Sequence, residues 1–374
     1  MFFRDIIGKN AIKKDLARTV VKGKVPHAQI FLSKEGNGSL PLALAYASYI
    51  LCENKRDGDS CGECNNCIKS SKFIHPDVHF SFPVVKIGDR KRETITSDDF
   101  LPKWRKILAD QPYMGSSEWF DTIEAGSSIP NINVKEINDI MHKLNMMSFE
   151  SDKKVLIMWL PEYLGNEGNR LLKLIEEPTD NTYIILVSEN QDMILKTILS
   201  RCQLIKIPAF SNVEIADLLV GKYNIIKVKA EQIANLADGN INLAINISNN
   251  ENRDFSDLLI TWLRVAYKLD PVDINAWLGK FLELNKDEQK NFFEYGLHFF
   301  RQYIFSLYTK AKEVNLTQAE VEIAAKMANI IDVPKAEQIV ILLNEAIEYV
   351  GRSINMRIAL FSDTITVGNI LRKK

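Results

Sequence analysis

Residues 28–51 read AQIFLSKEGNGSLPLALAYASYIL. The apolar run 28–32 has the length and composition of a buried strand, and Gly36 and Gly38 mark a tight turn after it. From Leu42 to Ile50 the apolar residues recur at helical spacing. The stretch therefore predicts a strand, a glycine-rich turn and a helix, which together form the opening of an α/β fold.

Further strand candidates follow along the chain. They are the apolar runs 154–159, 183–187 and 204–207. Helical patterns lie before, between and beside them, at about residues 134–147, 167–177 and 193–199. Strands that alternate with helices predict a parallel sheet covered on both faces. We expect this α/β core to span residues 1–208.

Beyond Pro208 the strand patterns stop. Ser211-Asn212-Val213-Glu214 fits a capping box at the start of a helix, and two more short helices follow, so residues 209–250 are predicted to form a small helical lid. Two apolar stripes at helical spacing then predict an all-α domain over residues 251–374. The stripes are Leu258, Leu259, Trp262, Leu263 and Ala266, and Phe292, Phe293, Leu297, Phe300 and Ile304. Their simplest interpretation is helix packing, and the outer face could also serve assembly.

The overall composition excludes several classes of protein. The chain has 374 residues, of which 46% are hydrophobic and 25% charged, as in ordinary soluble globular proteins. Its 47 basic and 48 acidic residues nearly cancel, so no global positive charge indicates nucleic-acid binding. No apolar run approaches the roughly 18 residues of a membrane span, and Met1 to Asp5 do not begin a signal peptide. We expect a cytoplasmic protein with reduced thiols.

Four of the five cysteines lie close together, at Cys52, Cys61, Cys64 and Cys67. The interval of two residues between successive ligands lets a tight turn bring two sulfurs to one ion at about 2.3 Å. Two disulfides in a secreted domain are the alternative, which the chain length and the missing signal peptide disfavour. We predict one structural zinc ion, because a closed four-thiolate site leaves no coordination position for a reacting water.

The glycine-rich turn resembles a phosphate-binding loop without its charged groups. A working loop reads G-x-x-x-x-G-K-[ST], in which the lysine reaches the phosphates and the hydroxyl holds magnesium. In this chain Ser39 and Leu40 stand at those two positions, and only Ser33, Gly36 and Gly38 keep the character of the turn. The second requirement is an acidic pair at the end of a buried strand. Here the strand ends in Met158-Trp159-Leu160-Pro161-Glu162, so apolar residues occupy the acidic positions.

One stretch does not continue the alternation of strand and helix patterns in the predicted α/β core. Residues from about 78 to 130 contain polar turns, several aromatic residues and a basic cluster of Lys86, Arg90, Lys91 and Arg92. The stretch is predicted to be an insertion. It is either packed on the core or a docking surface for a partner protein or DNA.

Several motifs together resemble the clamp-loader branch of the AAA+ ATPases, and within it the delta-prime type of bacterial DNA polymerase III subunit. They are residues 3–8 (FRDIIG), 26–28 (PHA), the cysteine module 52–67, 75–77 (HPD), 169–178 (NRLLKLIEEP) and 197–203 (TILSRCQ). The resemblance covers residues 1 to about 250. It implies an AAA+-type core, a helical lid, and a C-terminal oligomerisation domain called the collar.

Departures from the family pattern distinguish between its subunits. ATP-hydrolysing gamma/tau subunits keep an intact phosphate loop, an acidic strand end and a lid arginine, whereas Asn242 stands at the lid position here. The resemblance therefore implies a non-hydrolysing delta-prime-type subunit with no functional ATP site. It also implies that Arg201, in Ser200-Arg201-Cys202, acts in trans as an arginine finger on the ATP of a neighbouring subunit.

The same resemblance implies the partners. They would be gamma/tau-type and delta-type subunits, and through the complex the sliding clamp and primer–template DNA. We expect no activity of the chain alone, and membership of a DNA-directed DNA polymerase III holoenzyme. Two alternatives stay open: an ATP-hydrolysing subunit with a divergent loop, and a stand-alone zinc-containing DNA-binding protein.

Overall fold

The computed structural model describes residues 1–88, 90–126, 128–249, 255–309, 316, 318–351 and 354–373. The chain forms two compact units. The first comprises Met1–Tyr223 with Gly239–Asn242, and the second comprises Asn224–Asp238 with Leu243–Lys374. The predicted boundary after residue 208 falls inside the first unit, and the one after residue 250 lies outside the described residues. The division into core, lid and collar stays a prediction.

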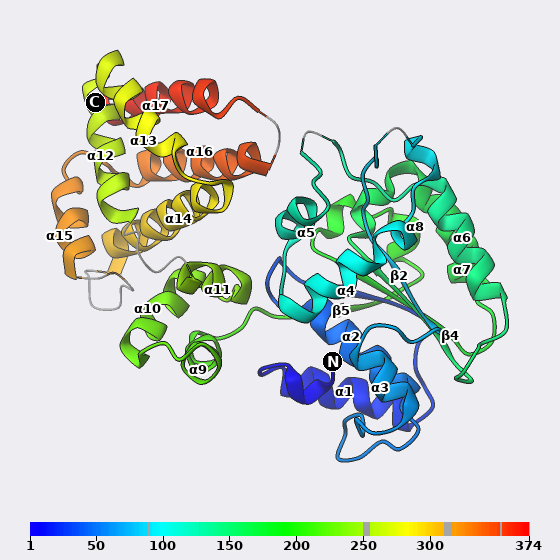
Figure 1. Ribbon diagram of the computed structural model, residues 1–374. Coiled ribbons are helices and arrows are strands. Elements are labelled where there is room, and N and C mark those ends of the chain that lie inside the picture. The colour runs from blue at the N-terminus through cyan, green and yellow to red at the C-terminus, as the bar shows by residue number, and fades with distance from the viewer. Residues whose placement is uncertain are drawn as a thin grey trace. The chain divides into compact units, whose positions relative to one another are not determined.

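The first unit is built around one five-stranded sheet (Figure 1). Its strands are β1 (Ala28–Leu32), β2 (Val78–Ser81), β3 (Lys154–Trp159), β4 (Thr182–Ser188) and β5 (Gln203–Lys206). The order across the sheet is β2-β3-β4-β1-β5, and every neighbouring pair is parallel. The predicted parallel α/β core is therefore confirmed. Because all five strands run the same way, the segments that follow them meet at one edge of the sheet.

Helices cover both faces of this sheet. The helices of the first unit are α1 (Asn10–Val21), α2 (Ser39–Leu51), α3 (Asn65–Ser71), α4 (Leu101–Asp110), α5 (Ser116–Thr122), α6 (Val134–Asn145), α7 (Gly168–Glu176), α8 (Lys196–Leu199) and α9 (Asn212–Tyr223). Alternate residues of β3 point to opposite faces, so Val155 and Ile157 join the apolar cluster around α2, while Leu156 and Met158 join the cluster around α6 and α7. The sheet is thus buried on both sides, as parallel sheets require.

Sequence reasoning missed the strand β2. Val78–Ser81 stood at the beginning of the predicted insertion, yet it pairs in parallel with β3 and forms one edge of the sheet. The run is only four residues long and carries the polar residues His79 and Ser81, so its apolar periodicity is too short to identify a strand.

The rest of the 78–130 stretch packs into the same core. Trp104 of α4 and Trp119 of α5 are fully buried and meet edge-to-face at 5.0 Å between ring centroids, and Phe82 stacks on Trp104 at 4.2 Å. Two of the basic residues have polar partners nearby: Arg90 pairs with Asp99, and Arg92 donates to Asn131. The aromatic residues therefore support packing on the core, not an exposed aromatic surface.

The second unit is helical. Its elements are α10 (Lys227–Ala237), most of α11 (Ile241–Asn249), α12 (Phe255–Lys268), α13 (Pro271–Leu282), α14 (Lys286–Thr309), α15 (Gln318–Met327), α16 (Val333–Gly351) and α17 (Met356–Arg372). The predicted stripes form its core: Trp262 stacks on Trp277, and Phe292 packs against both. Trp262 Nε1 donates to Thr364 Oγ1 at 2.9 Å, which joins α12 to α17. The predicted helical C-terminal region is confirmed for the described residues.

A membrane span was not expected from the composition. Among the described residues, no helix combines the length and the apolar character needed to cross a bilayer.

Candidate functional site

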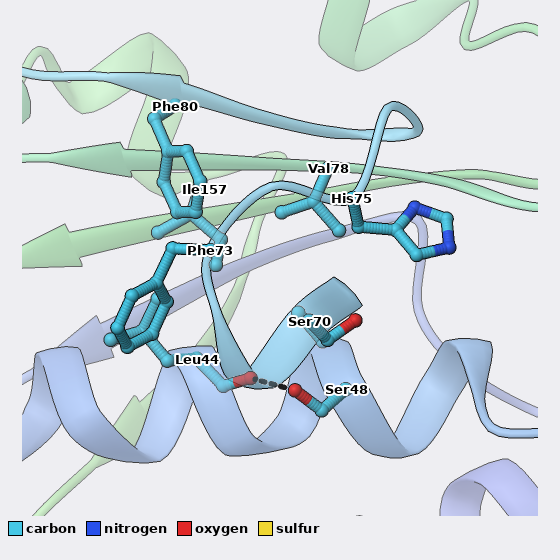
Figure 2. Close-up of a pocket in the computed structure, with 9 residues that line it drawn as sticks. Leu44, Ser48, Ser70, Phe73, His75, Val78, Phe80 and Ile157 are labelled. Atoms are coloured by element: carbon cyan, nitrogen blue, oxygen red, sulfur yellow. Dashed lines mark hydrogen bonds between the residues drawn. The ribbon is translucent and has the colours of Figure 1, made fainter. Parts of the chain in front are cut away.

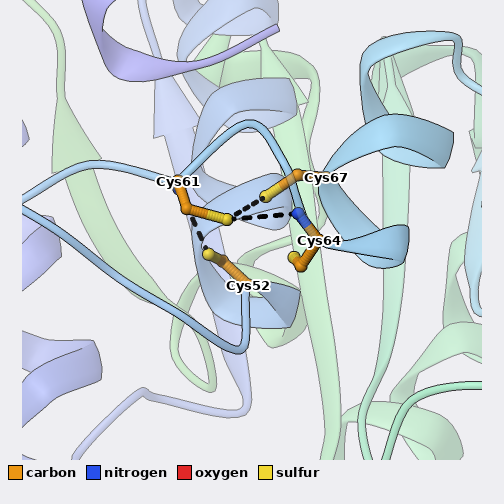
Figure 3. Close-up of side chains that lie close together, drawn as sticks. All are labelled: Cys52, Cys61, Cys64 and Cys67. Atoms are coloured by element: carbon orange, nitrogen blue, oxygen red, sulfur yellow. Dashed lines mark hydrogen bonds between the residues drawn. The ribbon is translucent and has the colours of Figure 1, made fainter.

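The four clustered cysteines converge on one point (Figure 3). Their sulfur atoms all lie within 4.8 Å of one another, and Cys61 Sγ lies 3.8 Å from Cys67 Sγ. Four sulfurs at about 2.3 Å from a tetrahedral ion would stand about 3.8 Å apart, so this spacing fits zinc. All four cysteines are free thiols. The donor set and its geometry therefore fit one metal ion, and the alternative of two disulfides is not the arrangement found.

Local structure explains how these thiols meet. Cys52 directly follows α2, Cys64 caps the N-terminus of α3, and Cys67 lies in its first turn. The intervening loop reverses at Gly58 and Gly62, whose φ angles of 76° and 82° lie in the region that favours glycine. Two helix ends thus hold three thiols, and the loop brings Cys61 to complete the set.

Backbone amides stabilise one thiolate in particular. The amides of Cys64 and Glu63 both donate to Cys61 Sγ at 3.4 Å. Burial acts to raise the pKa of the Cys61 thiol, but these two hydrogen bonds bring it down to about 6. Burial raises the pKa of Cys52 and of Cys67. The hydrogen bonds therefore favour the thiolate form of Cys61, the form that binds a metal ion.

The His75-Pro76-Asp77 motif connects the cysteine module to the sheet. His75 is buried, its Nε2 lies 3.0 Å from Asn66 Oδ1, and its Nδ1 accepts the Asp77 amide at 3.1 Å. Asn66 is the neighbour of Cys67 and donates to the Leu51 carbonyl at 3.0 Å. The motif thereby fixes α3 between the end of α2 and the beginning of β2, a role that its sequence spacing does not reveal.

A small cavity adjoins this network (Figure 2). Its volume is about 10 Å³, and its lining includes Leu44, Ser48, Ser70 and His75. Ser48 Oγ donates to the Leu44 carbonyl, whereas the buried Ser70 Oγ has no hydrogen-bond partner in the described structure. The space suits a single water molecule and excludes any nucleotide or metabolite.

The glycine-rich turn connects β1 to α2, as predicted. Gly36 and Gly38 adopt φ angles of 73° and 85°, which only glycine adopts without strain. Ser33 Oγ donates to Ser39 Oγ at 2.9 Å, and Leu40 is buried in the core. Neither residue at the lysine and magnesium positions offers a charge to a phosphate.

Side chains from elsewhere in the chain pack against this turn. A Cβ atom at Gly36 would lie 1.7 Å from Asn240 Oδ1, and one at Gly38 would lie 3.0 Å from the Phe210 ring and 3.3 Å from the Tyr113 ring. The Ile241 amide donates to the Gly36 carbonyl at 3.1 Å. Residues from three distant segments thus pack on the turn. Tyr113 gave no signal in the sequence, since only the folded insertion brings it there.

Asn242, at the predicted lid position, makes a contact of the same kind. Its Nδ2 donates to Glu118 Oε1 of α5 at 2.6 Å. The lid segment Gly239–Asn242 is therefore tied both to the glycine-rich turn and to the insertion, within the first unit. An uncharged amide stands where the gamma/tau-type pattern places an arginine.

The end of β3 is apolar, and the carboxylate that follows it is bonded within the chain. Trp159 and Leu160 are buried, so neither can present a group to a metal ion. Glu162 follows them and is buried too, but its Oε1 accepts from Ser188 Oγ and from the Glu189 and Asn190 amides at 2.6–2.8 Å. This carboxylate ties the end of β3 to the end of β4, which is a structural task that the sequence did not predict.

Arg201 has an ion-pair partner on α7. It follows α8 on the surface, where Nε contacts Glu176 Oε1 at 2.5 Å and Nη1 donates to the Thr197 carbonyl at 3.1 Å. The side chain stays 41% exposed. Its position is thus compatible with an external ligand, and its contacts are those of a local ion pair.

A sequence model of the family "DNA polymerase III, delta subunit" matches residues 8–211 of the chain. This match covers the sheet, the cysteine module and the Ser200-Arg201-Cys202 string. The chain belongs to the DNA polymerase III delta-subunit family. The resemblance to the clamp-loader branch is thereby confirmed.

Relatives of this family member agree with that assignment. The delta' subunit of Bacillus subtilis is 25% identical over 241 residues, which cover 64% of this chain and 59% of the relative. The delta' subunit of Yersinia pestis is 26% identical over 196 residues, covering 52% and 45%. The tau subunit of B. subtilis is 26% identical over 258 residues, covering 69% and 37%. The chain spans less than two thirds of the length of each.

A solved structure gives a weaker comparison. The gamma subunit-related protein of Thermotoga maritima aligns with 96% of this chain and 99% of its own, at 14% identity and a TM-score of 0.42. At that score it adds no argument about fold or function.

Proposed function

We propose that this chain is a non-hydrolysing delta-prime-type subunit of the DNA polymerase III clamp loader. In this role it assembles with gamma/tau-type and delta-type subunits and helps to load the sliding clamp onto primed DNA in the cytoplasm. Its core is of the AAA+ type, residues 209–250 form the helical lid, and residues 251–374 serve as the oligomerisation collar.

The observation that carries the proposal is the absence of charged groups at the glycine-rich turn, at Ser39 and Leu40. Phosphoryl transfer depends on a cationic clamp and a positioned metal ion. Ser39 and Leu40 supply neither, and Asn240, Phe210 and Tyr113 occupy the space next to the turn. A phosphate at this turn would gain no charge interaction from either Ser39 or Leu40. The ATP-hydrolysing alternative is therefore disfavoured.

The cysteine module is proposed to hold one structural zinc ion. Cys52, Cys61, Cys64 and Cys67 would be its four thiolate ligands, which leaves no position for a substrate. When bound, zinc would cross-link α2, α3 and the loop between them. The module also contacts the N-terminal segment, since Asp59 accepts from the Phe3 and Arg4 amides at 3.0 Å. Zinc would thus stabilise the side of the core that carries the FRDIIG motif.

Arg201 is proposed to act on a neighbouring subunit. A guanidinium fork can stabilise the charge that spreads over the γ-phosphate oxygens during hydrolysis. The glycine-rich turn of its own chain offers no phosphate to contact, which favours a role in trans.

Two measurements test the proposal. The purified chain should neither bind a fluorescent ATP analogue nor hydrolyse ATP above a protein-free control. When mixed with gamma/tau-type and delta-type subunits, it should co-elute with them and be required for clamp loading. Steady ATP turnover by the isolated chain would contradict the non-hydrolysing role. A chain that elutes as a monomer in the presence of those subunits would contradict the assignment to the clamp loader.

A further inference from the structure

A second and larger cavity lies at the edge of the sheet formed by β2. Its volume is about 150 Å³, and it lies between β2, the turn before it, α4 and α6. Pro76, Val78 and Leu101 contribute an apolar wall, and His79, Arg105 and Lys143 contribute nitrogen-bearing side chains. It belongs to neither the cysteine module nor the glycine-rich turn. Nothing in the proposed function uses it.

Two of these nitrogen-bearing groups have hydrogen-bonding atoms without a partner among the described residues. Arg105 Nε donates to the Phe73 carbonyl at 2.9 Å, but within the described residues Nη1 and Nη2 have no hydrogen-bond or ion-pair partner. The imidazole of His79 likewise has no hydrogen-bond partner among the residues that the structure describes. Burial, with Lys143 nearby, lowers the pKa of His79 to about 4, so the ring is neutral. An arginine fork without partners in the wall of a cavity is an unused donor site for an oxyanion.

The charge of the cavity indicates which oxyanion it suits. Lys143 pairs with Asp98 at 2.6 Å, and both residues line the cavity, so their charges compensate. Arg105 is then the one uncompensated charge in the lining. A single positive charge next to an apolar wall matches a monoanion with an apolar body better than a strongly hydrated dianion. A planar carboxylate also matches the geometry of the guanidinium fork.

The edge of β2 offers backbone groups beside this donor site. The Val155 amide of β3 donates to the Asp77 carbonyl at 2.9 Å, which sets the alternation of the ladder. In that alternation, Val78 and Phe80 direct their peptide groups away from β3, and both residues line the cavity. The Val78 amide donates to the His75 carbonyl at 3.1 Å, so the peptide groups of Phe80 are the ones that face the edge. An edge strand of this kind can pair with the backbone of an incoming peptide.

We propose that this cavity binds a carboxylate carried on a small apolar group, with the Arg105 guanidinium on the carboxylate and Pro76, Val78 and Leu101 around the apolar body. The carboxylate comes either from a free small molecule or from the C-terminal residue of a protein chain. Both sources share the chemistry that the cavity recognises. The proposal is independent of the clamp-loader assignment.

The test is a calorimetric titration of the full chain with four probes. They are 4-methylpentanoate, its neutral amide, the peptide acetyl-Gly-Gly-Leu with a free carboxylate, and the same peptide as an amide. Histidine-labelled protein reports in parallel on the His79 ring by NMR. Arg105→Gln is the test variant, and Lys106→Gln is the matched control, because Lys106 is the exposed neighbour on α4 and does not line the cavity.

The expected result is saturable binding of at least one carboxylate, with a shift of the His79 signal and no binding of the matching amide. Arg105→Gln should weaken binding by about ten-fold or more, given the strength of charged hydrogen bonds, and Lys106→Gln should leave it unchanged. Tighter binding of the peptide acid identifies a chain end as the source, and tighter binding of 4-methylpentanoate identifies a small molecule.

Three results would overturn the proposal: no saturable binding of either acid, equal binding of acid and amide, or affinity that Arg105→Gln leaves unchanged. If Arg105→Gln fails to fold, Arg105→Lys replaces it, since lysine keeps the charge and lacks the fork. That variant should also bind the acid more weakly, and unchanged affinity would again refute the assignment.

Discussion

The Nε atom of Arg201 lies 2.5 Å from Oε1 of Glu176. The two residues belong to two motifs of the family resemblance, TILSRCQ and NRLLKLIEEP, and the pair joins the segment after α8 to the end of α7. Their side chains are 41% and 46% exposed. An ion pair this exposed contributes about 0–1 kcal/mol to stability. The guanidinium can therefore exchange Glu176 for a phosphate at little cost.

Substituting Arg201 tests the proposed trans role. Arg201→Ala should leave the chain folded and assembled, because only an exposed pair is lost. It should lower ATP hydrolysis by the assembled complex by a factor on the order of 10 or more, since arginine fingers stabilise the charged transition state strongly. The measurement is the ATPase rate of the reconstituted complex with clamp and primed DNA.

Two further variants separate a catalytic arginine from a structural one. Arg170→Ala removes another exposed arginine, which lies on α7 and pairs with Glu167. This variant should leave the rate unchanged. Glu176→Gln breaks the local pair but keeps Arg201, and should also preserve the rate. An assembled Arg201→Ala complex that hydrolyses ATP at the unmutated rate would leave Arg201 with only its structural pairing.

The cysteine module should contain close to one zinc ion per chain. Elemental analysis of protein purified without added metal checks this stoichiometry. Cys64→Ser should lower the melting temperature and weaken subunit assembly, because metal binding free energy is also folding free energy. Cys202→Ser is the control, since Cys202 lies outside the cluster and should leave the zinc content unchanged. A metal-free protein of equal stability would rule out the site.

Asp77 should be a strong contributor to stability. Its carboxylate accepts from the amides of Phe149, Glu150 and Ser151 at 2.5–2.8 Å. Burial acts to raise the pKa of Asp77, but these backbone hydrogen bonds bring it below its ordinary value. The contribution is thus fully present above about pH 4 and is lost as the pH falls through the lowered value.

Asp77→Asn should therefore cost about 2–4 kcal/mol of unfolding free energy at pH 7, as expected for several charged hydrogen bonds. The cost should shrink at acidic pH. Denaturant titrations at a series of pH values measure it, with the exposed neighbour variant Asp152→Asn as the control. A cost of the same size at pH 7 and well below pH 4 would show that the carboxylate charge is unimportant.

The charge of Asp363 in α17 should destabilise the folded protein, in contrast to the charge of Asp77. Burial, together with Glu345, raises the pKa of its carboxyl to about 6, and Oδ2 has no hydrogen-bond partner in the described structure. The folded state therefore favours the protonated acid, and the charge destabilises the protein increasingly as the pH rises from about 4 to 6. Asp363→Asn should raise stability at pH 7 by on the order of 1 kcal/mol, after allowance for partial exposure.

Thermal denaturation of Asp363→Asn at two pH values checks this sign. The gain in melting temperature should be present at pH 7 and vanish near pH 4, where the native carboxyl is protonated. Glu345→Gln should reproduce a smaller part of the gain, because it removes the second cause of the shift. A gain that is the same at both pH values would contradict the electrostatic explanation.

The sequence by itself determined the features that short spacings encode. Strand, turn and helix could be identified in residues 28–51, and so could the capping box at Ser211 and Glu214. The cysteine spacing identified four thiols that converge in the structure. Each of these depends on neighbours along the chain, where periodicity and turn chemistry act directly. The same holds for Ser39 and Leu40, whose identity alone removes the charges that a phosphate needs.

Only the tertiary structure decided which distant segments meet. It placed β2 at the edge of the sheet, brought Asn240 and Phe210 onto the glycine-rich turn, gave Asp77 its three amides and paired Arg201 with Glu176. A buried polar group needs a hydrogen-bond partner, and a packed interior leaves few voids. The residues that meet these needs are those that the fold places nearby. Spacing along the sequence does not predict these contacts between distant segments, because they form only when the helices pack on the two faces of the sheet.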